Sequence, residues 1–229
     1  MSDDEYLNLN VLDEEDYKLN KLIYNKSILS GKVHGSLEDP LSQLFYDIAD
    51  IISPSLHYSN ITPNYVTTIR TLLMLFVFPF LFINKMYKSA AIVYILSYFG
   101  DCLDGHMSRK YNLETCFGDF YDHIADVLGF VVSIYLIIMN INEENNWIIV
   151  VILVVLLLSI VQVSCQERYL KMIGINKDSY TLNSISYMCP KSIIEDDDIE
   201  NTMNLTKFLG IGTYHLIMTI LIWNFKYLE

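Results

Sequence analysis

Apolar residues in this chain gather in long runs that short polar segments separate. A helix needs roughly 20 mostly apolar residues to cross a bilayer. The runs approach this length, so the pattern predicts an all-α, polytopic membrane bundle of five to six transmembrane helices. The expected spans are residues 65–84, 89–108, 119–140, 146–165 and 207–225.

The fourth run is the clearest span, because Trp147 to Val163 is almost uninterrupted Ile, Val and Leu, too long and too uniform for an ordinary buried helix. Residues 89–108 and 119–140 are weaker spans, since acidic residues lie at their ends. Residues 166–204 are polar and hold no apolar run of that length. A sixth helix is therefore short or absent there, or residues 37–56 supply a sixth element that lies in the membrane interface.

The segment before the first span has a different pattern. Its apolar residues recur at helical intervals, which predicts an interfacial amphipathic helix on the membrane surface within residues 36–60. Residues 1–35 are acidic and are expected to form a flexible cytoplasmic tail, and residues 61–229 form the transmembrane domain. The apolar positions of the amphipathic stretch are Leu41, Leu44, Phe45, Ile48, Ile51 and Ile52.

Composition narrows the function classes. The chain has 52% apolar residues, a mean hydropathy of +0.31 and a net charge of −12, so a nucleic-acid partner is not expected. No charged segment followed by an apolar one begins the sequence, which argues against a cleaved signal peptide. The four cysteines lack paired two-residue spacing, so neither a zinc knuckle nor a disulfide framework is indicated.

Four aspartates interrupt the apolar pattern between residues 101 and 126. Residues three, four or seven apart share a face of a helix, so these acids form two stripes. The connection 110–117 can fold one stripe against the other, which predicts a single cavity with four carboxylates. The first stripe holds Asp101, Asp104, Gly105 and Ser108, and the second holds Gly118, Asp122 and Asp126.

Such a cluster requires a cation, because burying ionised carboxylates is costly unless something compensates them. All-oxygen ligation suits Mg²⁺, Mn²⁺ or Ca²⁺, and Mg²⁺ commonly combines a few carboxylates with substrate phosphates and water. The pattern therefore predicts a divalent-metal site for a phosphate-bearing substrate.

These residues resemble a known family. The pattern D-x2-D-G-x2-A-R-x8-G-x3-D-x3-D is the signature of the CDP-alcohol phosphotransferases, and residues 101–126 match its spacing throughout, with Ser108 where alanine is usual. Pro63 and Asn64 resemble the Pro-Asn pair that begins the family's first helix. The resemblance covers residue 63 to about residue 225 and says nothing about residues 1–50.

The resemblance implies roles for the motif residues. Asp101, Asp104 and Asp122 would bind one or two Mg²⁺ or Mn²⁺ ions, and Asp126, at the same metal site, would accept the proton of the attacking hydroxyl. Residues expected to bind the CDP moiety are Gly105, Ser108, Arg109 and Gly118.

The implied activity belongs to phospholipid biosynthesis: transfer of a substituted phosphate from a CDP-linked donor, expected to be CDP-diacylglycerol, to an alcohol, with release of CMP. The residues between Asp104 and Asp126 are most similar to phosphatidylinositol synthases, so inositol is the expected acceptor. Val127 departs from that branch, where arginine is usual. Asp122-His123 instead resembles choline and ethanolamine phosphotransferases, which use diacylglycerol as acceptor, and glycerol 3-phosphate and serine also stay open.

Two other classes must be considered. One is an inactive relative that serves as a membrane scaffold, which the intact acids argue against. The other is a small metal-ion transporter, for which the fixed arginine and glycine spacing has no evident use.

Orientation follows from the basic residues, which favour the cytoplasmic side. Seven lie in connections on the side of the acidic stripes and three on the other side, so the site is expected to face the cytoplasm, in an endoplasmic-reticulum-type membrane in a eukaryotic cell. The family resemblance also suggests a homodimer. The seven are Arg109, Lys110, Arg168, Lys171, Lys177, Lys191 and Lys207, and the three are Lys85, Lys88 and Lys226.

Overall fold

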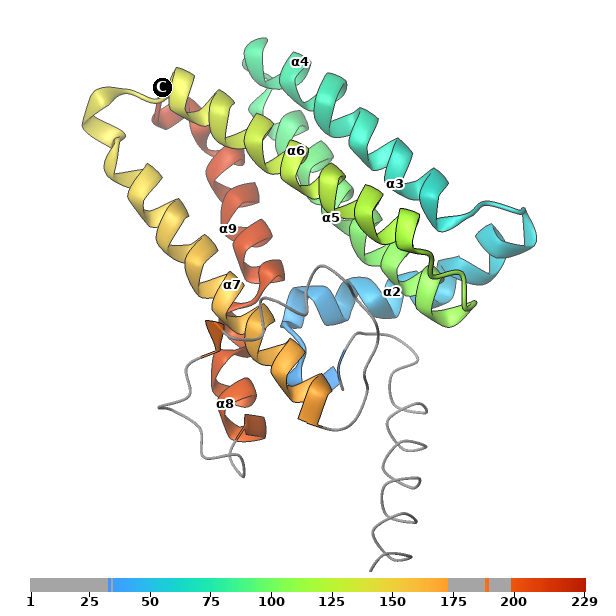
Figure 1. Ribbon diagram of the computed structural model, residues 1–229. Coiled ribbons are helices and arrows are strands. Elements are labelled where there is room, and N and C mark those ends of the chain that lie inside the picture. The colour runs from blue at the N-terminus through green and yellow to red at the C-terminus, as the bar shows by residue number, and fades with distance from the viewer. Residues whose placement is uncertain (1–32, 34, 173–187, 190–198) are drawn as a thin grey trace, which may run out of the picture.

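The computed structural model describes residue 33 and residues 35–172, 188–189 and 199–229, and within them the chain is built of helices (Figure 1). This confirms the predicted polytopic helical membrane fold. Residues 1–32 of the expected acidic tail lie outside the described residues. Four helical segments of this part of the chain are long and apolar enough to cross a membrane: Pro63–Ile83, Cys116–Asn140, Glu143–Leu170 and Thr202–Trp223.

Helix α2, Pro40–Tyr58, is the predicted amphipathic helix. It begins where the Asp39 carboxylate accepts hydrogen bonds from the backbone nitrogens of Leu41 and Ser42, which satisfies amides that have no partner within the helix. Helix α2 runs across the ends of the other helices rather than along them (Figure 1), and it packs against α5 and α9.

The first span has three parts: α3, Pro63–Leu72; a π-helical turn η2, Leu73–Val77; and α4, Phe78–Ile83. Pro79 explains the irregular turn, because proline has no backbone N–H and its ring collides with the carbonyl four residues earlier. Widening the turn to a π-helix relieves that collision and keeps the segment continuous. One polar stripe of α3 faces α5 and α6 and carries site residues.

Helices α5, Tyr87–Lys110, and α6, Cys116–Asn140, carry the acids. Asn112, at φ 52°, turns the chain between them, a conformation that asparagine tolerates better than most residues. Helix α5 was expected to be a span, although a weak one, but it is not among the four apolar segments. Its acidic and basic residues interrupt the apolar run. It packs against α2, α3 and α9, which shield it from lipid.

Helix α7, Trp147–Met172, continues seven residues beyond the predicted end of the fourth span. Near its end Gln166 donates a hydrogen bond to Glu38 across 3.0 Å, so polar contacts with the N-terminal segment replace the lipid environment. The last span begins with α8, Ile199–Thr206, and the short turn η7, Lys207–Leu209. It breaks at the extended residue Gly210 and ends with α9, Ile211–Trp223.

The apolar core lies toward the end of the bundle opposite α2. There the rings of Phe82, Tyr87 and Phe225 pack with centroids 4.8–5.3 Å apart. Many large apolar side chains on the spans are exposed instead, among them Phe76, Phe80 and Val150. Exposure of this kind suits helices whose outer faces contact lipid rather than water.

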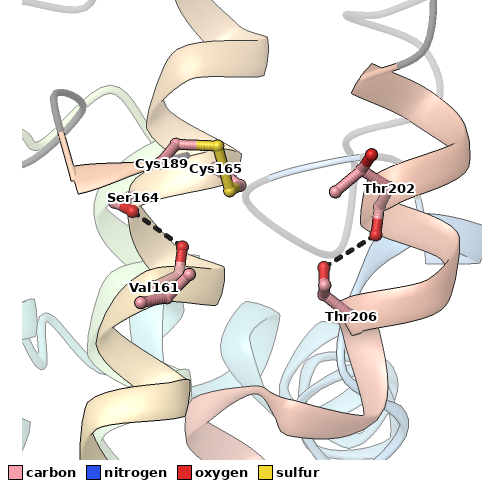
Figure 2. The surroundings of a disulfide bond; sticks show 6 residues. All are labelled: Val161, Ser164, Cys165, Cys189, Thr202 and Thr206. Carbon is pink, nitrogen blue, oxygen red and sulfur yellow. Dashed lines mark hydrogen bonds between the residues drawn. A yellow bond between two sulfur atoms is a disulfide. The ribbon is translucent and has the colours of Figure 1, made fainter. Parts of the chain in front are cut away.

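One covalent link was not expected from the sequence. Cys165 on α7 forms a disulfide with Cys189 and so closes a loop of sequence separation 24 (Figure 2). The expectation that the cysteines form no disulfide was therefore wrong. The spacing rule failed because the partner of Cys165 comes from a segment brought back to α7 by the fold. Cys102 is free and buried, and Cys116 is free and exposed.

Candidate functional site

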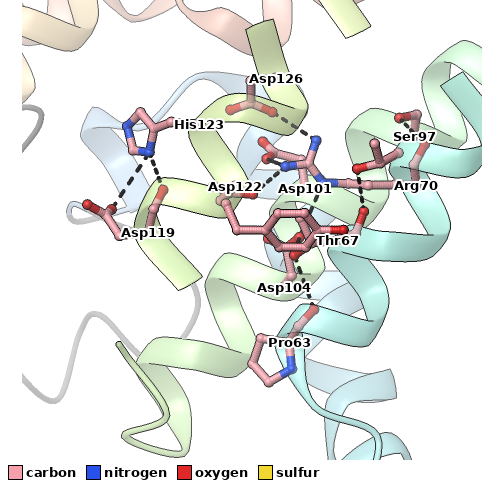
Figure 3. Close-up of polar contacts among 12 residues, drawn as sticks. Pro63, Thr67, Arg70, Ser97, Asp101, Asp104, Asp119, Asp122, His123 and Asp126 are labelled. Carbon is pink, nitrogen blue, oxygen red and sulfur yellow. Dashed lines mark hydrogen bonds and ion pairs between the residues drawn. The ribbon is translucent and has the colours of Figure 1, made fainter. Parts of the chain in front are cut away.

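The four motif aspartates converge on one side chain, Arg70 of α3 (Figure 3). Its Nη2 lies 3.0 Å from Asp101 and also contacts Asp122, its Nε lies 3.2 Å from Asp104, and its Nη1 lies 2.8 Å from Asp126. The two predicted stripes therefore face one space. Because the Arg70 side chain is only 7% exposed, these ion pairs are shielded from water.

Within this cluster the acids are not equivalent. Carboxylate oxygens of Asp101, Asp122 and Asp126 all lie within 4.8 Å of one another. Asp104 is set apart: it is 4% exposed, and it accepts hydrogen bonds from Thr67 at 2.6 Å and from Arg70. Of the four acids predicted to ligate metal, three thus form a compact group and the fourth is held against α3.

The group fits a divalent cation. It offers oxygen ligands alone, which hard cations such as Mg²⁺ and Mn²⁺ prefer, and one guanidinium cannot neutralise four carboxylates. Asp101 and Asp126 also line a cavity, so their free oxygens are open to a ligand.

Sequence reasoning missed Arg70 and Thr67. The signal was present, because an arginine inside an apolar run destined for the membrane is by default a candidate functional residue. Thr67 lies four residues after Pro63, and Arg70 lies seven residues after it. At this helical spacing both side chains lie on the face of α3 that meets α5 and α6.

The expected CDP-binding residues lie around the cluster in different ways. The Ser108 hydroxyl donates to the Asp104 carbonyl at 3.1 Å, so the usual alanine is replaced without leaving a free polar group. A Cβ on Gly118 would lie 3.0 Å from Thr115 Oγ1 and 3.2 Å from Asn64 Oδ1. Glycine at this position therefore lets Asn64 approach the first turn of α6.

Arg109 folds back along α5 toward Gly105. A Cβ on Gly105 would lie 3.1 Å from Arg109 Nη1, so the glycine makes room for the guanidinium. The centroid of the Tyr46 ring, on helix α2, lies 5.4 Å from Arg109 Cζ. Within the described part of the chain no carboxylate pairs with Arg109, and its buried Nη2 has no hydrogen-bond partner.

The two histidines next to the motif do not join the cluster, because adjacent residues of a helix point to different faces. His123 Nδ1 contacts the carbonyl oxygen of Asp119 at 2.6 Å, on the side of α6 away from Arg70 (Figure 3). His106 is 1% exposed, and its Nε2 lies 3.3 Å from Asp50 on α2.

Helix α2 is fastened to the acid-bearing end of α5. Asp50 pairs with Lys110 Nζ at 2.5 Å, and this hydrogen bond, before all other causes, lowers the pKa of Asp50 below its usual value. Lys110 Nζ also donates to the Asp50 carbonyl at 3.3 Å. That carbonyl has no helical partner, because Pro54 four residues later has no N–H.

A cavity of about 380 Å³ adjoins the cluster. Sequence reasoning did not identify His215 of α9, which lines it and stacks on Tyr98 with ring centroids 4.0 Å apart. The cavity is polar near the acids and otherwise apolar, a combination suited to an amphiphile. Its apolar lining includes Met74, Val127, Phe130, Leu156, Ile160 and Ile211.

Comparison with known proteins points to the same chemistry. A family model described as CDP-alcohol phosphatidyltransferase matches residues 60–189, which include α3, α5 and α6. No solved structure matches the chain.

The curated relatives are bacterial proteins named CDP-diacylglycerol--glycerol-3-phosphate 3-phosphatidyltransferase. The Rickettsia felis protein is 35% identical over 85 residues, 35% of this chain and 47% of the relative. The Wigglesworthia glossinidia brevipalpis protein is 34% identical over 118 residues, 48% of this chain and 63% of the relative. The chain thus spans about half the length of the curated relatives it matches. Their names do not confirm the expected likeness to phosphatidylinositol synthases.

Proposed function

Because the chain belongs to the CDP-alcohol phosphatidyltransferase family, we propose that it transfers the phosphatidyl group of CDP-diacylglycerol to an alcohol and releases CMP. The observation that carries this proposal is the group formed by Asp101, Asp122 and Asp126. Their oxygens, from two helices, lie within 4.8 Å of one another beside a largely apolar cavity. A diphosphate joined to a lipid needs both features.

Asp101, Asp122 and Asp126 would hold Mg²⁺ or Mn²⁺, with Asp104 adjoining them. Such an ion withdraws charge from the phosphoryl oxygens and from the CMP leaving group. The protein's own residues hold these acids in position. Thr67 and Arg70 fix Asp104, and packing of α5 between α2 and α3 keeps the acidic stripe facing α6.

Asp126 is the base of the proposed reaction. Its side chain is 50% exposed, whereas those of Asp101 and Asp122 are 28% and 30% exposed, and it lines the cavity. The acceptor hydroxyl attacks the phosphorus that bears the diacylglycerol, the bond from that phosphorus to the CMP oxygen breaks, and Asp126 takes the hydroxyl proton.

Glycerol 3-phosphate is the acceptor that we propose first, because the curated relatives carry it in their names. Inositol, the acceptor expected from the sequence, has only the resemblance between Asp104 and Asp126 in its favour. The choline and ethanolamine alternative relied on His123, and that side chain contacts Asp119 away from the cluster.

The test is CMP release by the full chain in lipid-containing micelles with CDP-diacylglycerol and Mg²⁺ or Mn²⁺. The acceptors are glycerol 3-phosphate, inositol, serine, and, with CDP-choline as donor, diacylglycerol. The proposal expects CMP and a phosphatidyl product with glycerol 3-phosphate. Release of CMP with inositol as the only effective acceptor would replace glycerol 3-phosphate as the acceptor but leave the proposed reaction type intact. Failure of every donor and acceptor pair to release CMP would refute the proposed activity.

We also propose that the acidic end faces the cytoplasm and that the protein forms a homodimer. Cys116 offers a test of orientation, because it is exposed at the start of α6, close to the motif. A membrane-impermeant maleimide should label Cys116 from the cytoplasmic face only, and Cys116→Ser should abolish that labelling. Labelling from the opposite face alone would reverse the orientation.

A further inference from the structure

Helix α2 lies outside the region that the family model matches, yet one of its side chains contacts the motif. We propose that Tyr46 is a positioning residue that holds the Arg109 guanidinium ready for the diphosphate of the donor. The inference rests on the proposed function, since it assigns a task within the same site. It extends that site to a helix that sequence reasoning interpreted only as a membrane-surface element.

Arg109 differs from Arg70 in its surroundings. Arg70 contacts four carboxylates, whereas no described residue forms an ion pair with Arg109. Its Nη2 is nevertheless buried, with no hydrogen-bond partner. A buried donor of this kind calls for an explanation, and a ligand that accepts from the guanidinium provides one.

The contact with Tyr46 is suited to this purpose. The face of an aromatic ring attracts a guanidinium without consuming its N–H donors or neutralising its charge, and the ring centroid lies 5.4 Å from Arg109 Cζ. Burial raises the pKa of Tyr46 above its ordinary value, and even an unperturbed tyrosine, with a pKa of about 10, is neutral at physiological pH. Arg109 is therefore held in place while its donors stay available for bidentate contact with phosphate.

The ring of Tyr46 is itself fixed relative to α5. One turn before it, the hydroxyls of Ser42 and Tyr98 are hydrogen-bonded at 2.7 Å. One turn after it, Asp50 pairs with Lys110. Contacts on both sides leave α2 little freedom to slide along α5, so the ring of Tyr46 stays over the Arg109 guanidinium.

The test is calorimetric titration of the full chain in detergent with CDP and Mn²⁺, alongside the donor KM and kcat. Tyr46→Leu should weaken CDP binding and raise the KM for CDP-diacylglycerol by about three- to tenfold, with kcat changed less than about twofold, because a cation–π contact is lost. Tyr46→Phe keeps the ring and should stay close to wild type. Tyr58→Leu, the same change at a 90% exposed position of α2, is the matched control.

Measuring the same substitution in a second variant distinguishes a positioning role of Tyr46 from a purely structural one. In Arg109→Gln, which removes the cation, Tyr46→Leu should have no further effect on CDP affinity. Unchanged CDP binding in Tyr46→Leu, an equal loss in Tyr46→Phe, or an undiminished loss in the Arg109→Gln background would each overturn the inference. So would a wild-type protein that binds no CDP. Wild-type CDP binding without CMP release would refute the proposed activity and leave the Tyr46 contact to be judged by the titrations.

Discussion

Arg70 of α3 donates a hydrogen bond from Nη1 to Asp126 of α6 across 2.8 Å, although 56 residues separate them in the chain. The same guanidinium reaches the acids of α5. Arg70 therefore holds together two helices whose carboxylates would otherwise repel each other. Its position accounts for the convergence of the two acidic stripes.

Replacing Arg70 with glutamine should destabilise the protein. Removing one partner of a buried ion pair typically costs about 3–5 kcal/mol, and here four carboxylates lose their shared partner. Thermal unfolding in detergent should show a lower Tm for Arg70→Gln than for wild type. Saturating Mn²⁺ should raise the Tm of Arg70→Gln by more than it raises the Tm of wild type.

The control for this prediction is Lys85→Gln. Lys85 pairs with Glu229 at 2.9 Å, but its side chain is 70% exposed, and exposed ion pairs contribute little to stability. Equal metal-free stability of Arg70→Gln and wild type would contradict the role given to Arg70.

Asp126→Asn should remove most of the catalytic activity. Asparagine keeps the shape of the side chain but accepts no proton, and loss of a general base typically lowers turnover by about 10²–10⁴-fold. The measurement is kcat for CMP release. Asp119→Asn, the same change on the same helix but beside His123, should keep turnover near wild type, and a similar loss in both variants would rule out a specific role for Asp126.

The contact between Asp50 and Lys110 should make the docking of α2 depend on pH. The Lys110 hydrogen bond lowers the pKa of Asp50 in the folded protein. The ionised Asp50 carboxylate therefore contributes its full stabilisation above the pKa of an unfolded aspartate, about 3.9. That stabilisation is lost as the pH falls through the lower pKa that Asp50 has in the folded protein.

Thermal unfolding of wild type and Asp50→Asn between pH 3 and pH 8 checks this. The Tm difference should be constant from pH 8 to about pH 5 and should shrink below about pH 4. A difference that grows on acidification would contradict the assigned direction.

The disulfide predicts a particular thiol count. Without reductant, the unfolded protein should react with maleimide at two cysteines, Cys102 and Cys116, and after reduction at four. Closing a loop of this length stabilises by about 3 kcal/mol in the chain-entropy model, so Cys165→Ala with Cys189→Ala should lower the Tm. Four reactive thiols before reduction would show that the bond does not form.

The sequence supplied those parts of the fold that depend on local pattern. Apolar runs placed four of the five expected spans within about five residues, and helical spacing placed Asp101 and Asp104 on one face. The sequence pattern could not predict which distant residues these side chains contact. Arg70 is 34 residues from Asp104 and Tyr46 is 63 from Arg109, and periodicity indicates which face of a helix is buried but not what covers it.

Where the structure departs from expectation, a long-range contact explains the difference. Helix α7 continues past residue 165 because Gln166 meets Glu38, and Cys165 finds Cys189 because the chain returns to α7. Asp104 leaves the compact group of acids because Thr67 of α3 holds it. The acids themselves could be identified, since buried charge at helical spacing has few explanations.

The central claim is that carboxylates from α5 and α6 bind the same divalent ions. Titration of the full chain with Mn²⁺, followed by electron paramagnetic resonance, tests it in wild type, Asp101→Asn, Asp122→Asn and the double variant. Each single substitution should weaken the same Mn²⁺ site, and the double variant should lose less affinity than the sum of the single losses, because the two acids share a ligand. Strictly additive losses, or wild-type Mn²⁺ binding that neither substitution changes, would contradict the claim.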